Sequence, residues 1–212
     1  LLWYLWFEWA VPFYLKKYKI DHFFSPDSYL SLRTKIPQTV VIHDLAFEHF
    51  PEAVGGLVGK FYSFYLPRYA QKAKQIITVS EFTKADIVQE YKVPRSKIQV
   101  AYNAADLKFK PSTNEQNLFV KKTYTVDESY FLYVGALHPR KNIERLLLAF
   151  DRFKKVRECD MKLLLVGRKA WANQEVEATY EAMQFKDDVV FTGRVSDEDL
   201  VCLLYTSPSP RD

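Results

Sequence analysis

Three short apolar segments, each closed by a glycine and then by cations, constrain this chain more than any other feature. They are residues 131–134 before Gly135, residues 163–166 before Gly167, and residues 189–192 before Gly193. Runs this short and this apolar are typical of strands that are covered on both faces of a sheet. In an open parallel sheet, the carboxyl ends of the strands line the ligand crevice. The sequence therefore predicts an α/β fold with a binding edge at the three glycines.

The first segment leads into a predicted helix through a cationic junction. Asn142 is a favourable N-cap. Apolar residues then recur at helical spacing: Ile143, Leu146, Leu147, Phe150 and Phe153. Arg140 and Lys141 precede the helix, where its dipole makes each cation unfavourable by roughly 0.3–1 kcal/mol. An anion held by the free N–H groups would explain the pair. The alternative is that both side chains point into water, where salt screens the penalty.

The same cationic theme follows the other two glycines. Arg168 and Lys169 come directly after Gly167, and Arg194 comes directly after Gly193. Three cationic strand ends along one crevice favour a polyanionic small molecule, such as a diphosphate, as the ligand.

Composition limits the class of protein. A chain of 212 residues fits one or two domains, and 48% hydrophobic residues can supply their cores. A net charge of +4, with the cations at strand ends and not along one exposed helix, argues against nucleic-acid binding. Cys159 and Cys202 predict a reducing compartment and no disulfide framework. No histidine pairs with a cysteine at zinc-like spacing, so no metal site is expected.

Both ends of the chain are predicted to be artificial cuts. The apolar opening contains Glu8 and is shorter than the roughly 20 residues of a membrane span. A buried helix is favoured over a helix lying on a membrane. At the other end, Ser196 begins a capping-box pattern, but residues 202–212 resemble the translation of a transposase sequencing adapter. We therefore expect 202–212 to be a non-native, adapter-derived tail and exclude it from the fold prediction.

The rest of the chain alternates predicted strands and helices, which is typical of parallel α/β sheets. Residues 107–127 are richer in polar residues and are predicted to be a linker. The predicted organisation is an N-terminal α/β domain at 1–106 and a C-terminal α/β domain that begins at 128 and runs to 201.

Several segments together resemble one known family. They occur along nearly the whole chain: V-V-I-H-D (40–44), I-I-T-V-S-E-F-T (76–83), V-A-Y-N-A-A-D (100–106), Y-V-G-A-L-H-P-R-K-N-I (133–143), L-L-L-V-G (163–167) and V-V-F-T-G-R-V-S-D-E-D-L (189–200). The chain resembles a family 4 retaining glycosyltransferase with the GT-B fold. The resemblance implies two Rossmann-like parallel-sheet domains that bind a nucleotide-sugar. Residues 1–106 would be the acceptor-side domain, with its start missing, and residues 128–201 would be the first part of the nucleotide-sugar-binding domain, which is incomplete.

The resemblance also implies roles for particular residues in the C-terminal domain. Arg140, Lys141 and Gly135 would hold the nucleotide diphosphate. Many family members carry an arginine directly after this glycine, whereas this chain has Ala136, so Arg140 would supply that charge. The residues assigned to the nucleotide base are Gly193, as a close backbone approach, Val195 and Arg168.

His43 is the candidate catalytic residue of the N-terminal domain. The resemblance implies that it faces the donor sugar or the leaving phosphate, with Asp44 as a substrate-binding residue that orients the loop. A histidine at a strand end can donate a hydrogen bond to a hydroxyl or phosphate oxygen. The alternative is that His43 is a core residue hydrogen-bonded to Asp44.

The resemblance implies a hexosyl transfer to a saccharide or lipid-linked acceptor, in the cytoplasm or peripherally at the inner face of the membrane. Fixed positive charge, not a metal or cofactor, would stabilise the leaving diphosphate. A glycine-rich loop before Leu1 and a glutamate pair after Val201 would be missing, so the fragment is expected to be inactive. Two other functions are compatible with these residues: a GT-B-type nucleotide-sugar epimerase, and a non-catalytic module that binds a nucleotide or polyanion.

Overall fold

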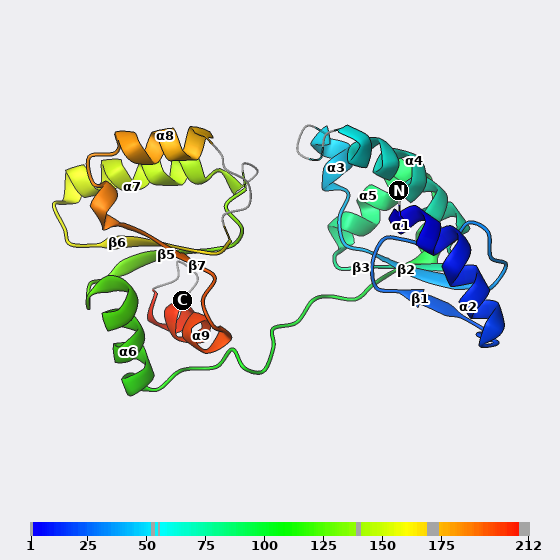
Figure 1. Cartoon of the computed structure of the whole chain (residues 1–212), viewed down its shortest axis with the longest axis horizontal. Coiled ribbons are helices and arrows are strands. Elements are labelled where there is room, and N and C mark those ends of the chain that lie inside the picture. The colour runs from blue at the N-terminus through cyan, green and yellow to red at the C-terminus, as the bar shows by residue number, and fades with distance from the viewer. Residues whose placement is uncertain (1, 52–53, 55, 139–140, 169–173, 208–212) are drawn as a thin grey trace. The chain divides into compact units, whose positions relative to one another are not determined.

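The computed structural model describes residues 2–51, 54, 56–138, 141–168 and 174–207. The chain divides into two compact units, Leu1–Ala104 and Ala105–Asp212. Each unit contains one parallel sheet with helices packed on it (Figure 1). The predicted fold class, α/β with two parallel sheets, is therefore confirmed.

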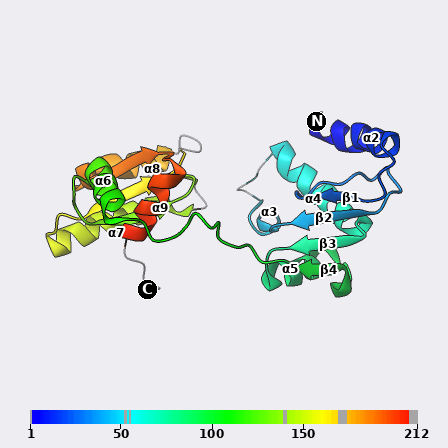
Figure 2. The same cartoon turned by 90° about the horizontal axis from the view of Figure 1, so that it is seen from below.

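The first unit is built on a four-stranded sheet in the order β1-β2-β3-β4, with every neighbouring pair parallel. Figure 2 shows these strands side by side. The elements are α1 (Leu2–Leu5), a π-helical turn (Trp6–Ala10), α2 (Val11–Lys17), β1 (Phe23–Ser25), β2 (Gln38–Ile42), α3 (Ala46–His49), α4 (Gly56–Lys72), β3 (Gln75–Thr78), α5 (Glu81–Tyr91), a 3₁₀ turn (Arg95–Lys97) and β4 (Ile98–Val100).

The core of the first unit lies between its strands and helices α4 and α5. Val40, Ile76 and Ile87 are completely buried in it, at 0% exposure. Ser80 caps α5: its hydroxyl accepts a hydrogen bond from the Thr83 N–H at 3.1 Å. The opening helix is buried on one face only: residues such as Phe7 and Val11 pack inward, while several of its tryptophans stay exposed.

The second unit is built on a three-stranded parallel sheet in the order β5-β6-β7. The elements are α6 (Asn114–Thr125), β5 (Tyr130–Val134), α7 (Ile143–Arg157), β6 (Lys162–Val166), α8 (Gln174–Ala182), a 3₁₀ turn (Lys186–Asp188), β7 (Val189–Gly193) and α9 (Asp197–Thr206).

Helices cover both faces of this sheet (Figure 1). Leu163 and Leu165 of β6 pack in the cluster formed with α7 and α8. Leu164 and Val166, which alternate with them, pack in the cluster formed with α6 and α9. Alternation across a pleated strand places successive side chains on opposite faces. The continuous apolar run of β6 is thus explained by burial on both sides, as predicted.

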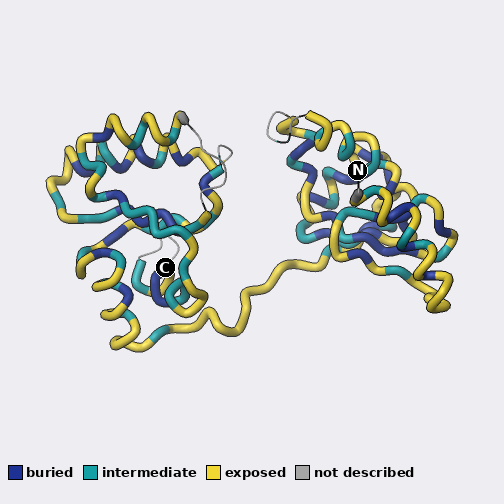
Figure 3. Tube along the Cα trace, in the orientation of Figure 1, coloured by how far each residue is buried: buried dark blue, intermediate teal, exposed yellow. Residues whose placement is uncertain are grey.

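The predicted linker at 107–127 is shorter in the structure. Residues 101–111 are exposed throughout (Figure 3), but α6 follows and belongs to the second unit. Thr113 and Gln116 form a reciprocal capping box at the start of α6, and Val120 is buried against the sheet. The sequence prediction was wrong here because α6 shows only a narrow apolar stripe, which is hard to distinguish from a polar connection.

The region excluded from the fold prediction also contributes structure. Helix α9 continues past Val201 to Thr206, and Cys202 and Leu203 are buried in the same cluster as Val120. The Tyr130 hydroxyl donates to the Leu203 carbonyl oxygen at 2.9 Å. Residues 202–206 therefore complete one face of the second unit. The adapter origin of 202–212 stays a prediction, and residues 208–212 lie outside the described structure.

Candidate functional site

The three glycine-ended strands finish together at one edge of the second sheet. The Gly135 N–H donates to the Val166 carbonyl at 2.9 Å, and the Gly167 N–H donates to the Gly193 carbonyl at 2.8 Å. Beyond the strands, the Leu137 N–H donates to the Arg168 carbonyl at 3.1 Å. These bonds continue the parallel register past the ends of the strands and fix the turns that follow.

Gly167 is the tightest point of this edge. Its φ is +146°, and a Cβ built there would lie 2.0 Å from the Gly135 carbonyl oxygen. No side chain fits at that distance, so glycine is required for the two backbones to meet. Gly193 differs, because its φ is +71° but a Cβ would meet nothing within 4 Å. Within the protein, the close backbone approach is therefore at Gly167 and not at Gly193.

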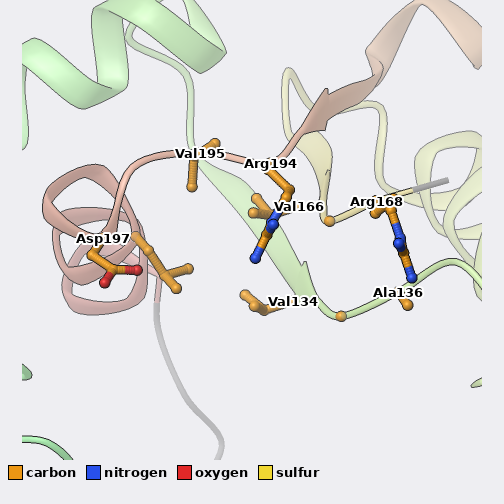
Figure 4. Close-up of a pocket in the computed structure, with 10 residues that line it drawn as sticks. Val134, Ala136, Val166, Arg168, Arg194, Val195 and Asp197 are labelled. Carbon is orange, nitrogen blue, oxygen red and sulfur yellow. The ribbon is translucent and has the colours of Figure 1, made fainter. Parts of the chain in front are cut away.

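A pocket of about 450 Å³ opens beside these strand ends (Figure 4). Its walls are formed by backbone atoms at the glycines, by apolar side chains and by charged side chains. The lining residues are Val134, Gly135, Ala136, Val166, Gly167, Arg168, Arg194, Val195, Asp197 and Leu200.

Two arginines give the pocket its charge. The Arg168 side chain extends toward Ala136, and the Arg194 side chain lies beside Val166 (Figure 4). The Lys108 ammonium is 2.6 Å from Asp197 and holds the pKa of that carboxyl below its ordinary value, with a smaller contribution from Arg194. Asp197 is thus already paired with a cation, and the remaining charge of the pocket is positive. Such a pocket is suited to an anion.

The structure brings together only some of the residues predicted for this site. Gly135, Arg168 and Val195 line the pocket, and Gly193 adjoins it through its backbone. Lys141 is exposed in the turn before α7, where its N–H donates to the His138 carbonyl at 2.8 Å, but it does not line this pocket. Arg140 lies outside the described residues.

Asn142 stands at the predicted N-cap position but does not cap α7 with its side chain. Its backbone is left-handed, with φ +56°, and the side chain makes no capping hydrogen bond. Asparagine adopts this conformation more readily than most residues, which explains its presence there without a capping role.

Arg194, Asp197 and Leu200 are among the pocket residues to which the sequence prediction gave no role. Arg194 was recognised as a strand-end cation but was not assigned a role. Asp197 and Leu200 belong to α9, whose first turn follows β7 after only three residues. A connection that short holds the start of the helix against the strand ends, which is the signal that could have placed them.

His43 and Asp44 follow β2 in the first unit. His43 is exposed, its Nε2 lies 3.1 Å from the Pro26 carbonyl, and its own carbonyl accepts from the Thr83 hydroxyl at 3.4 Å. The Asp44 carboxylate accepts from the Ala46 N–H at 2.9 Å and so orders the start of α3. His43 is therefore not a core residue bonded to Asp44. Since a carbonyl only accepts, a neutral His43 carries its proton on Nε2, and Nδ1 is an acceptor.

Among the residues that the structure describes, no group of three histidine, cysteine, aspartate or glutamate side chains is placed to hold a metal ion. Within the same described residues, no helix has the length and apolarity needed to cross a membrane.

Comparison with known proteins identifies the family. Residues 1–109 match Glycosyltransferase Family 4, and residues 114–207 match Glycosyl transferases group 1. The chain belongs to glycosyltransferase family 4. The two matches meet near the boundary between the two units of this family 4 chain.

Curated relatives support the same family. The chain is 32% identical over 167 residues to the O-antigen chain mannosyltransferase RfbU of Salmonella typhimurium, covering 78% of this chain and 42% of the relative. It is 27% identical over 187 residues to the O-antigen chain mannosyltransferase B of Escherichia coli, covering 88% of this chain and 49% of the relative. This family 4 chain thus spans about half the length of the curated relatives it matches.

Solved structures share the fold. One is WaaG, a glycosyltransferase involved in lipopolysaccharide biosynthesis, with a TM-score of 0.68, 16% identity, and coverage of 93% of this chain and 54% of WaaG. Another is Anabaena Alr3699/HepE in complex with UDP-glucose, with a TM-score of 0.68, 16% identity, and coverage of 88% of this chain and 51% of that protein.

Proposed function

We propose that this chain is part of a retaining glycosyltransferase that moves a hexosyl group from a nucleotide-sugar to a saccharide or lipid-linked acceptor. The observation that carries the proposal is the cationic pocket at the strand ends of the second unit, in a chain of family 4. Its size, its apolar valines and its arginines suit a ligand with a flat base at one end and phosphates at the other. The relatives named as mannosyltransferases support a hexosyl donor.

The second unit would hold the leaving group. Departure of a nucleoside diphosphate leaves negative charge on its phosphate oxygens, and fixed cations and N–H groups at the strand ends stabilise that charge without reorganising. We assign Gly135, Lys141 and Arg140 to the diphosphate. We assign Gly193 and Val195 to the base. Because fixed charge supplies this stabilisation, we propose that the reaction needs no metal and no cofactor.

The first unit would supply His43. Its exposed ring can accept a hydrogen bond from a sugar hydroxyl through Nδ1 while Nε2 is bonded to Pro26. Donation to a phosphate oxygen through Nδ1 would require the protonated ring. Asp44 would act by ordering the loop that carries His43.

We further propose that the protein works in the cytoplasm, with peripheral contact to the inner face of the membrane where the acceptor is lipid-linked. Both cysteines are free thiols, which is consistent with a reducing compartment. Nucleic acid is not a proposed partner, because the two described pocket arginines follow strand ends and do not form a basic helix face.

The experiment is an activity assay on the full-length protein with UDP-hexoses and GDP-hexoses and an oligosaccharide or lipid-linked acceptor. Transfer with retained configuration at the anomeric carbon, seen by NMR, is the expected result. Activity should be unchanged by EDTA and should fall in a His43→Ala variant. Interconversion of the nucleotide-sugar without transfer would instead indicate an epimerase, and binding of the nucleotide with neither reaction would indicate a non-catalytic module.

A further inference from the structure

The pocket has two chemically different ends. Val195 and Leu200 pack together in one apolar cluster with Val166, and they form one wall. Ala136 and the Arg168 side chain form the other wall, on the opposite side from Val195 in Figure 4. Purine and pyrimidine rings favour apolar contact, whereas phosphates favour cations and N–H groups. Arg168 therefore lies at the phosphate end of the pocket.

Ala136 gives Arg168 the room to lie there. Ala136 carries only a methyl group, and its carbonyl is held by the Tyr133 hydroxyl at 3.1 Å. The Arg168 carbonyl is bonded to the Leu137 N–H, so the two strand ends are fixed next to each other. The Arg168 side chain starts from this fixed point and ends beside Ala136 (Figure 4). A larger side chain at 136 would compete with it for this space.

The charge of Arg168 is not neutralised by the described part of the protein. Among the described residues, no carboxylate is ion-paired with Arg168, in contrast to Lys108 and Asp197 across the pocket. An arginine can bind two phosphate oxygens at once through its planar fork of N–H groups.

We propose that Arg168 is a phosphate-binding residue of this pocket, and that Ala136 is the small neighbour that makes this position accessible to it. The proposal rests on the proposed function, because it takes a nucleoside diphosphate as the ligand. It replaces the assignment of Arg168 to the nucleotide base. The cation at this point of the site then comes from the end of β6 and not from the end of β5.

The test is binding of UDP, GDP and the matching nucleosides to the full-length protein by calorimetry. Arg168→Ala should weaken binding of the diphosphate about tenfold to a hundredfold, the loss of a charge-assisted hydrogen bond. Binding of uridine or guanosine should stay within about twofold, and the midpoint of urea unfolding should not move. Arg157→Ala, which removes an exposed cation from the last turn of α7, is the control and should bind like the wild type.

A double variant makes the test sharper. In Arg168→Ala combined with Ala136→Arg, an arginine returns to the same space from the neighbouring strand, and most of the diphosphate affinity should return. Equal losses for diphosphate and nucleoside, or unchanged diphosphate binding in Arg168→Ala, would overturn the proposal and leave the proposed function intact. A wild-type protein that binds neither UDP nor GDP would overturn the proposed function and, with it, this assignment.

Discussion

At the scale of single residues, glycine has two different roles at the pocket edge. Gly167 is required because the Gly135 carbonyl occupies the place of its Cβ. Gly193 is favoured only by its backbone, because the space around it is open. The two substitutions by alanine should therefore differ in cost, although both positions have positive φ.

Gly167→Ala should destabilise the second unit by about 3 kcal/mol or more, because a methyl group 2.0 Å from a carbonyl oxygen forces the strand ends apart. Gly193→Ala should cost only about 1–2 kcal/mol, the cost of a left-handed backbone. Urea unfolding of both variants measures the difference. Similar losses at the two positions would contradict the close approach at Gly167.

Lys141→Ala in the full-length protein should weaken binding of a nucleoside diphosphate about tenfold or more and leave nucleoside binding nearly unchanged. The reason is that Lys141 stands beside the first turn of α7, where a phosphate would be held. Calorimetry with both ligands measures the effect. Equal weakening of the two would contradict the assignment, and Arg157→Ala again serves as the control.

The sequence was sufficient to predict which residues end the strands, because glycine after an apolar run is a local signal. It was not sufficient to predict what the side chains of Arg168 and Arg194 do. Their directions depend on the register between β6 and its neighbours, which is a property of the assembled sheet. The hydrogen-bond partner of His43 could not be predicted either, since Pro26 is seventeen residues away in the chain.

At the scale of elements, a charged cluster joins three segments of the second unit at the amino ends of its strands. Lys154 of α7 is 4% exposed, and its ammonium lies 2.8 Å from the Asp188 carboxylate and donates to the carbonyl oxygens of Cys159 and Met161. Lys162 of β6 lies 2.5 Å from the same carboxylate. Burial acts to raise the pKa of Asp188, but hydrogen bonds from the two lysines outweigh it and hold that pKa below its ordinary value.

Asp188→Asn should lower the free energy of unfolding of the second unit by about 1–3 kcal/mol at neutral pH. A depressed pKa means that the contribution of Asp188 is complete above the unfolded-state pKa of about 3.9 and is lost as the pH falls through the folded-state value. The difference between wild type and variant should therefore be constant from about pH 5 to 7 and shrink below about pH 4. Hydrogen exchange of Leu164 and Leu165 in β6 measures it.

The matched control is Glu181→Gln, which removes a carboxylate from an exposed pair with Lys186 in the same unit. Exposed pairs contribute little to stability, so this variant should unfold like the wild type at every pH. A pH dependence that is the same for both variants would contradict the role given to Asp188.

Predictions of helices and strands were correct where the apolar pattern was broad or continuous, and wrong where it was a narrow stripe. Strand β6 and helix α7 show continuous apolar runs or broad stripes, and both were predicted close to their observed bounds. Helix α6 buries only Val120 and Thr125, so its pattern resembled a connection. Proline usually kinks or ends a helix, yet α4 continues through Pro67 as one helix from Gly56 to Lys72. Packing of the residues around it, such as Leu66 and Tyr69, keeps the helix together.

At the scale of the whole molecule, the connection between the two units is short and exposed. Residues 101–111 are exposed at every position, and neither unit buries them (Figure 3). Each unit has its own sheet and its own core clusters. The chain is therefore expected to be cut by proteases between two resistant halves.

Limited digestion with trypsin should cleave first after Lys108, which is exposed in this connection. Lys110 should stay uncut, because it precedes Pro111 and trypsin does not cleave before proline. Mass spectrometry of the early products should show one fragment that ends at residue 108 and one that begins at residue 109. Early cleavage within α4 or α7, before any cut at 101–111, would contradict the division into two units.

The packing of α9 has a practical consequence for cloning. A coding region trimmed at residue 201 would delete Leu203, whose carbonyl accepts the hydrogen bond of the buried Tyr130 hydroxyl. It would also strip apolar cover from Val120 and Leu164. A protein in which another helical, apolar sequence replaces residues 202–207 should be more stable and more soluble than a protein that ends at residue 201.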